Sequence, residues 1–211
     1  MPEQLADQKA ALARIQEHLE KSSERVLIGI IGKPGAGKST LSKFLMGKLP
    51  KDLVTVVPMD GYHLSNKVLK DLKRSDRKGA PDTFDVAGFV SLVKRIRSEQ
   101  TQNIYYPIFD RAIEESIAAQ GVVTSATKVV IIEGNYLLHD EGGWEVLNDL
   151  LDESWMVDVD DDKRISRLIS RHIAYGKDPE AAKAWAKGTD EVNAKLIERG
   201  RTRADFVVVI D

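Results

Sequence analysis

A glycine-rich turn at residues 32–39, GKPGAGKS, carries the strongest chemical signal in the chain. Its spacing, a glycine followed after four residues by glycine, lysine and serine, is typical of a loop that binds nucleotide phosphates. Glycines let backbone N–H groups approach phosphate oxygen atoms, because no side chain blocks the way. Lys38 can neutralise the β- and γ-phosphates, and the Ser39 hydroxyl can bind Mg²⁺. The predicted phosphate contacts are Gly32, Lys33, Pro34, Gly35, Ala36, Gly37, Lys38, Ser39 and Thr40.

Two acidic residues each follow an apolar run. Asp60 ends the run DLVTVVPMD, and Glu133 follows KVVII. If both runs are parallel strands, their carboxyl ends share one edge of the sheet with the glycine-rich turn. Asp60 can then accept the proton of an attacking hydroxyl group, and Glu133 can order Mg²⁺ together with Ser39. The alternatives are a turn that begins at Asp60 and a helix cap at Glu133.

Three arginines, Arg164, Arg167 and Arg171, stand at positions i, i+3 and i+7 of DDDKRISRLISRHIAYGKD. This spacing places them along one stripe of a helix. Because arginine stays charged and binds phosphate through two nitrogen atoms, the stripe suits a lid that closes over a triphosphate. The alternative is a solvated helix face.

The elements that must position these groups are strands separated by helices. The runs RVLIGII, DLVTVVP, KVVIIEG, SWMVDVD and DFVVVID predict strands buried on both faces of a parallel sheet. A helix should follow the glycine-rich turn and stop before Pro50, and Asp85 should cap another. The pattern predicts a three-layer α/β fold of the P-loop NTPase type, with a mostly parallel five-stranded sheet and a helical lid at about residues 160–195.

The first part of the chain is predicted to be an appendage to this fold. Leu5, Leu12, Ile15 and Leu19 recur at helical spacing between charged residues, so residues 1–24 should form an amphipathic helix packed on the core. Residues 25–211 contain no internal repeat or linker and are expected to form a single domain.

Composition narrows the class of protein. The 211 residues are 42% hydrophobic and 30% charged, which is ordinary for a folded soluble protein, and the net charge of −2 does not favour nucleic acid or an anionic membrane. There is no cysteine, so disulfides and thiolate sites are excluded, and the four histidines are scattered. Without a signal peptide or a membrane-length apolar run, a cytoplasmic location is expected.

The γ-phosphate has three conceivable fates. A GTPase needs a guanine-binding Asn-Lys-x-Asp, but NKVL at Asn66 ends in leucine, and DVAG at Asp85 follows no apolar run. A transport ATPase usually shows a paired acid after a strand, whereas Glu133 stands alone. A small-molecule kinase needs an acceptor pocket, a base and mobile cations, and candidates exist for all of them.

Several segments together resemble the P-loop family of uridine kinases, phosphoribulokinases and bacterial pantothenate kinases, over roughly residues 25–211. They are MDGYHL, APDTFD, YPIFDR, the arginine-rich lid and TRADFVVVI. The resemblance implies that Asp60 is the catalytic base and that the arginines contact phosphate. It also implies acceptor contacts from Tyr62, from His63 and from Phe109, which replaces a family tyrosine.

Departures from the family pattern bear on the acceptor. Uridine kinases carry an acidic residue that binds ribose just before HPDAFD, whereas this chain has Gly79 there, so uridine is not the expected acceptor. RKGAPDTFD and the N-terminal helix are similar to short bacterial relatives called nucleoside kinase-like or fructose transport system kinase. Arg77, Lys78 and Arg111 suggest an acceptor that carries a carboxylate or phosphate, although Lys78 can equally be solvated.

The resulting hypothesis is an ATP- and Mg²⁺-dependent kinase for a nucleoside, sugar or pantothenate-like acceptor; an ATP-binding regulatory module is the alternative, and GTP is an alternative donor. No nucleic acid or membrane partner is expected, and a homo-oligomer is left open. Catalysis is assigned to Asp60, Lys38, Arg167 and Arg171, nucleotide binding also to Arg164, and the metal to Ser39 and Glu133. The predicted substrate-binding residues are Asp60, Tyr62, His63, Arg77, Phe109, Asp110, Arg111 and Glu133.

Overall fold

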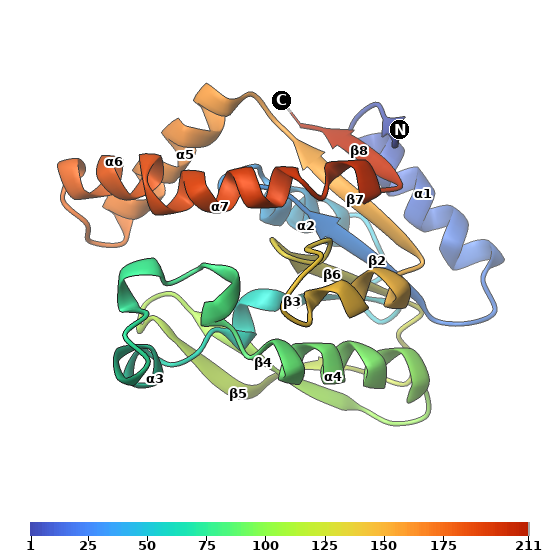
Figure 1. The fold of residues 1–211 in the computed structure, drawn as a ribbon. Helices are drawn as coiled ribbons and strands as arrows, with labels where there is room; N and C mark the ends of the chain where they lie inside the picture. Colours follow the sequence, from blue (N-terminus) through green and yellow to red (C-terminus); the bar gives the residue numbers. More distant parts are fainter. Residues whose placement is uncertain (211) are drawn as a thin grey trace.

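The central element of the computed structural model, which describes residues 1–210, is a six-stranded sheet in the order β1-β8-β7-β2-β6-β3 (Figure 1). All neighbouring strands in it are parallel. The strands are β1 (Glu3–Leu5), β2 (Val26–Ile31), β3 (Val54–Pro58), β6 (Val129–Gly134), β7 (Glu153–Asp158) and β8 (Phe206–Val209).

Two hydrophobic clusters cover the two faces of the sheet. Alternate residues of β2 point into different clusters, as the two-residue period of a strand requires: Ile28 and Ile30 into one, Leu27 and Ile31 into the other. The first cluster contains α1 (Gln8–Lys21) and α2 (Lys38–Met46), and the second contains α4 (Val86–Ser98), the 3₁₀ segment η4 (Trp144–Leu150) and Ile197 of α7 (Thr189–Glu198). The predicted three-layer α/β class is confirmed.

The helices of the predicted lid follow β7. They are α5 (Asp161–Ala174), α6 (Pro179–Lys187) and α7. In Figure 1, α5 and α6 extend beyond the sheet, and α7 returns across it toward β8. Asp160 caps α5 by accepting hydrogen bonds from the backbone N–H groups of Asp162 and Lys163.

The prediction of five strands was one strand short. The sixth is β1, in which Leu5 pairs with Val208 of β8, although Leu5 was assigned to the N-terminal helix. A strand of three residues is too short to show a period, and it forms here because the edge of β8 offers unpaired backbone groups. The helix begins only at Gln8, where the Asp7 side chain accepts from the N–H groups of Lys9 and Ala10.

An antiparallel hairpin outside the main sheet was not predicted. Strands β4 (Ile104–Asp110) and β5 (Glu115–Val123) pair only with each other and lie beside α4 (Figure 1). The hydroxyl of Tyr106 donates to the carbonyl oxygen of Val56 at 2.8 Å, which ties the hairpin to β3. The remaining short segments are α3 (Asn66–Asp71), η1 (Met59–Tyr62), η2 (Ser75–Arg77), η3 (Pro81–Thr83) and η5 (Arg201–Arg203).

Gly61 allows this hairpin to approach Asp60. An added Cβ atom at Gly61 would overlap the carbonyl oxygen of Pro107 in β4. We expect Gly61→Ala to lower the free energy of unfolding by about 1–3 kcal/mol, because a closely packed backbone must move. Urea denaturation measures the change, with Gly47→Ala as the matched control, since a Cβ atom there meets its neighbours at an ordinary 3.4 Å. Equal stability of the two variants would contradict the close approach.

Within residues 1–210, no helix combines the length and the apolar character needed to cross a bilayer.

Candidate active site

The glycine-rich turn joins β2 to α2 and requires backbone conformations that favour glycine. Gly35 has φ of 80° and Gly37 has φ of 97°. A Cβ atom at Gly35 would lie only 2.7 Å from the carbonyl oxygen of Arg164, so the turn passes directly against α5. The backbone N–H groups that open α2 lie in this turn, as expected for an anion site at a helix N-terminus.

Lys38 lies over this turn. Its ammonium group donates to the carbonyl oxygen of Gly32 at 2.8 Å and more weakly to that of Lys33 at 3.4 Å. Burial lowers the pKa of Lys38 to about 8, although the carboxylates of Glu133 and Asp60 oppose this change. An anion bound in the turn would raise this pKa again and so favour the charged ammonium group.

Glu133 connects the end of β6 with α2. The Ser39 hydroxyl donates to one of its oxygen atoms at 2.5 Å, and the Ser42 hydroxyl donates to the other at 2.8 Å. This contact exists because β2 and β6 are neighbours, with Ile31 opposite Gly134. The predicted pair Ser39 and Glu133 is thus brought together by the sheet.

A hydroxyl beside a carboxylate is a hard oxygen donor set and fits Mg²⁺. Residues 1–210 contain no cluster of three or more histidine, cysteine or acidic side chains that could hold a metal ion. Mg²⁺ is usually held by one or two protein groups together with phosphate oxygen atoms and water.

Asp60 lies in η1, directly after β3, and β3 pairs with β6 so that Pro58 stands opposite Glu133. Arg111 donates to the Asp60 carboxylate at 2.8 Å. Burial tends to raise the pKa of Asp60, yet the nearby positive groups Arg111 and Lys38, and His63 when it is protonated, bring the pKa below its ordinary value. The carboxylate is therefore ionised at neutral pH, as a proton acceptor must be.

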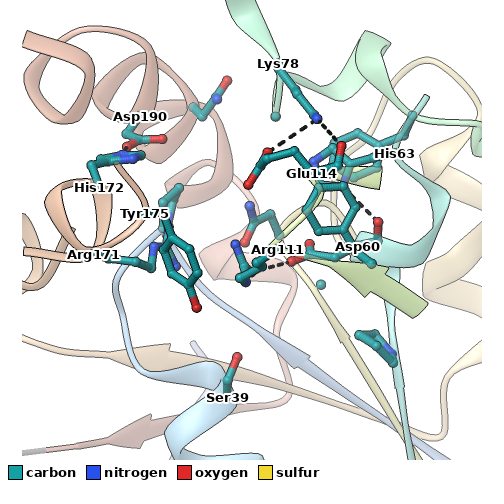
Figure 2. Close-up of a pocket in the computed structure, with 18 of the residues that line it drawn as sticks. Ser39, Asp60, His63, Lys78, Arg111, Glu114, Arg171, His172, Tyr175 and Asp190 are labelled. Atoms are coloured by element: carbon teal, nitrogen blue, oxygen red, sulfur yellow. Dashed lines mark hydrogen bonds and ion pairs between the residues drawn. The ribbon is translucent and has the colours of Figure 1, made fainter. Parts of the chain in front are cut away.

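A single cavity of about 450 Å³ joins the glycine-rich turn to Asp60. Figure 2 shows Ser39, Asp60, Arg111 and Arg171 around the same space. The turn, β3, β6, the β4–β5 hairpin and helices α5–α7 all contribute side chains. The predicted site residues in its lining are Pro34, Lys38, Ser39, Asp60, His63, Phe109, Arg111, Glu133 and Arg171.

The three arginines of the stripe have different surroundings. Arg171 faces the cavity, where burial and then the charge of Arg111 lower its pKa. Such a desolvated guanidinium favours an anionic ligand. Arg167 is exposed, and its guanidinium lies 3.7 Å from the place where a Cβ atom of Gly37 would be. Phosphate contacts by Arg167 and Arg171 stay a prediction.

Arg164 does not have the environment expected of a nucleotide contact. Its side chain is 1% exposed, and it donates to Asp161 at 2.8 Å and to Glu191 at 2.6 Å. A further nitrogen atom lies 3.5 Å from the carbonyl oxygen of Pro34. The guanidinium thus braces the glycine-rich turn against α5 and α7, because it lies on the part of the stripe that α7 covers.

Other predicted site residues lie outside the cavity lining. Tyr62 packs edge-on against Phe89, with ring centroids 5.3 Å apart. Arg77 pairs with Asp82 at 2.9 Å, and Asp110 accepts from the N–H group of Ala112 at 2.8 Å. The Lys33 side chain pairs with Asp161 at 2.9 Å, so Lys33 can offer only its backbone to a phosphate.

His63 and Phe109 form part of an aromatic wall. The His63 ring packs against Phe84 at 4.1 Å and Phe109 at 4.8 Å between centroids. Phe84 is 5% exposed and belongs to the core, as expected of an ordinary packing residue, although one side of it lines the cavity. Lys78 donates to the Asn66 side chain at 2.8 Å and to the carbonyl oxygen of Glu114 at 2.9 Å, so it ties the hairpin turn to α3.

The lining also contains residues that the sequence did not suggest. They come from helices α5–α7 and the adjoining turns and include His172, Tyr175, Lys177, Trp185, Asp190 and Asn193. Tyr175 stands four residues after Arg171, so an extension of the arginine stripe by one turn would have found it. The others depend on how α6 and α7 fold back on α5.

Comparisons with known proteins show the family to which the chain belongs. The profile of the Phosphoribulokinase / Uridine kinase family matches residues 27–210. The chain is 32% identical to "Putative uridine kinase C227.14" of Schizosaccharomyces pombe over 203 residues. This alignment covers 90% of this chain and 85% of that protein. The chain is also 32% identical to "Uncharacterized protein YggC" of Escherichia coli over 188 residues. This alignment covers 87% of this chain and 77% of that protein.

A solved structure is also similar. The crystal structure of the "putative fructose transport system kinase from Silicibacter sp. TM1040" superposes with a TM-score of 0.85 at 39% identity and covers 95% of this chain and 98% of that one. The profile match spans the glycine-rich turn, both strand-end acids and the lid helices. The chain therefore belongs to the phosphoribulokinase/uridine kinase family.

Proposed function

We propose that this protein is an ATP-dependent phosphotransferase that moves the γ-phosphate of ATP to a hydroxyl group of a small metabolite. One observation carries the proposal: Lys38 and Ser39 of the phosphate-binding turn line the same cavity as the Asp60 carboxylate. An acceptor beside Asp60 can therefore meet a phosphate held by the turn. The family membership supports the same reaction class.

In the proposed reaction, the acceptor oxygen attacks the γ-phosphorus while Asp60 takes up the hydroxyl proton. The bond from the γ-phosphorus to the bridging oxygen breaks, and ADP leaves. Arg111 orients Asp60 through their 2.8 Å ion pair. Lys38 and Arg171 stabilise the charge that spreads over the transferring group. Ser39 and Glu133 would hold Mg²⁺, which when bound neutralises phosphate charge. We propose that α5–α7 close over the nucleotide as a lid.

Binding of ATP should be accompanied by proton uptake. Because the pKa of Lys38 is about 8 in the nucleotide-free protein, part of the population is uncharged at pH 8.5. A bound triphosphate raises that pKa, so each binding event takes up roughly half a proton or more, and ATP affinity falls as the pH rises above 8. Calorimetry in two buffers of different ionisation enthalpy measures the uptake. Lys38→Arg, whose guanidinium does not titrate, should abolish it; unchanged uptake would point to another group.

The alternative is a regulatory module in which ATP moves the lid and no acceptor is phosphorylated. Purified protein with ATP-Mg²⁺ is incubated with nucleosides, sugars, polyols, sugar acids and pantothenate, and ADP release is followed. Stimulation by one class of acceptor supports the kinase. ATP binding without stimulation by any class supports the module.

A further inference from the structure

The side of the cavity formed by α7 contains an amide whose polar atoms reach the open space and have no hydrogen bond to the described residues. Asn193 is 5% exposed and lines the cavity, and its side chain forms no hydrogen bond with any of residues 1–210. Buried polar side chains nearly always have a hydrogen-bond partner, and the Asn193 amide has none in the protein because its polar atoms face the cavity. An amide that faces an open cavity is instead available to a ligand, as donor and as acceptor.

A second polar group lies in the same lining. His172 of α5 and Asp190 of α7 form a hydrogen-bonded pair at 2.7 Å, and Asp190 is 9% exposed. The contact uses Nε2 of the imidazole and one carboxylate oxygen; within the described chain, the other ring nitrogen and the other oxygen have no hydrogen bond. Figure 2 shows this pair across the view from Lys78 and Glu114. The pair therefore offers a ligand a carboxylate oxygen as acceptor and an imidazole nitrogen, in addition to the Asn193 amide.

Aromatic side chains accompany these polar groups. Trp185 and Tyr175 line the cavity beside the lid helices, and Phe109 lines it from the hairpin. Aromatic faces pack well against the C–H groups of a small ligand. Pockets that fix the orientation of a small molecule usually combine aromatic and apolar walls with a small number of polar groups. Together they suit a carbon chain or ring that carries several hydroxyl groups.

Apart from Lys38 and Arg171, which we assign to the nucleotide phosphates, each cation of the cavity lining already has a neighbouring protein group. Lys78 pairs with Glu114 at 3.4 Å, and Arg111 pairs with Asp60 at 2.8 Å. The ammonium of Lys177 lies over the Trp185 ring, 4.5 Å from its centroid. A carboxylate or phosphate at the far end of the acceptor would instead approach the Asp190 carboxylate, and like charges in such a place are repulsive. The expectation of an anionic acceptor, drawn from Arg77, Lys78 and Arg111, stays a prediction, but each of these cations already pairs with an acidic side chain.

We propose that the phosphate acceptor is an uncharged polyol or sugar whose non-reacting hydroxyl groups bind Asn193, Asp190 and His172. This inference rests on the proposed kinase function. It assigns to α7 the part of the site that distinguishes acceptors, whereas the glycine-rich turn and Asp60 carry out the transfer.

The test compares neutral acceptors with acids of the same skeleton. Erythritol, xylitol, sorbitol and fructose are assayed against xylonate, gluconate and uridine, with ADP release as the readout. Asn193→Ala is expected to raise the KM for the neutral acceptor roughly tenfold, as loss of a hydrogen-bonding group does, with the KM for ATP unchanged. Asp190→Asn, which keeps the side-chain volume, should act in the same direction. Asn148→Ala is the matched control, because Asn148 is exposed and lies outside the cavity lining.

The outcomes separate this inference from the proposed function. Higher kcat/KM for a neutral acceptor than for its acid, together with the KM effect of Asn193→Ala, supports the inference. A higher kcat/KM for an acid or for uridine overturns the inference and leaves the kinase function intact. The same conclusion follows if the Asn193→Ala variant binds ATP normally and has the same KM for the acceptor as Asn148→Ala. If the wild-type protein binds ATP-Mg²⁺ but none of these acceptors stimulates ADP release, the inference fails; the proposed function fails as well only if the wider panel with further nucleosides and pantothenate also gives no stimulation.

Discussion

Replacing Asp60 with asparagine is expected to lower turnover by roughly two to four powers of ten, the usual contribution of a general base. Asparagine keeps the shape of the side chain but cannot take up the acceptor's proton. The substitution also removes the negative partner of Arg111, so the guanidinium stays beside a neutral amide. ATP affinity should be largely unchanged, because the phosphate contacts that we propose lie at the glycine-rich turn and the lid.

Rates of the wild type and of Asp60→Asn are measured at saturating concentrations of ATP and acceptor, so that they report kcat. Asp149→Asn serves as the control, since Asp149 is exposed and lies outside the cavity lining. Because the pKa of Asp60 lies below its ordinary value, the wild-type carboxylate stays ionised down to acidic pH. Asp60 should therefore impose no loss of turnover between pH 6 and pH 8. Turnover of Asp60→Asn equal to that of the wild type would remove Asp60 from the mechanism.

Replacing Lys38 with alanine is expected to cost about 3 kcal/mol of transition-state stabilisation, which is a loss of roughly two powers of ten in kcat/KM. The ammonium group lies at the turn, where it donates to the carbonyl oxygen of Gly32 at 2.8 Å and can turn toward a bound phosphate. A positive charge at this point stabilises the transition state most, because negative charge develops on the transferring phosphoryl group there.

Stability should behave differently from activity in this variant. Burial lowers the pKa of Lys38, so the folded protein disfavours the charged form, and removal of the ammonium group should not lower the free energy of unfolding. Lys43→Ala is the matched control on the same helix, because Lys43 is exposed. Urea denaturation and steady-state kinetics distinguish the two effects. A Lys38→Ala variant that keeps full activity would contradict the assignment of the turn, and a variant that loses stability in parallel with activity would indicate a structural role.

Local signals in the sequence predicted what depends on local physics. β2 and β6 read as continuous apolar runs, and both are almost entirely buried in the sheet. Asp85 was expected to cap a helix, and its carboxylate accepts from the N–H group of Gly88 at 2.9 Å. The glycine-rich turn was recognisable because its backbone conformations require glycine at particular positions, as the positive φ angles of Gly35 and Gly37 show.

Tertiary structure decided the features that depend on partners distant in the chain. Arg164 and Arg171 share one helical stripe, yet Glu191 of α7 pairs with Arg164, while Arg171 stays at the cavity. Residue spacing places side chains on one helix face but cannot say which part of that face another helix will cover. β1 likewise exists because β8 pairs with it. Asn193, Asp190 and His172 meet through the packing of α5 with α7, and no short-range pattern encodes that packing. Sequence alone therefore identified the turn that we propose binds phosphate, and the fold determined which other side chains line the same cavity.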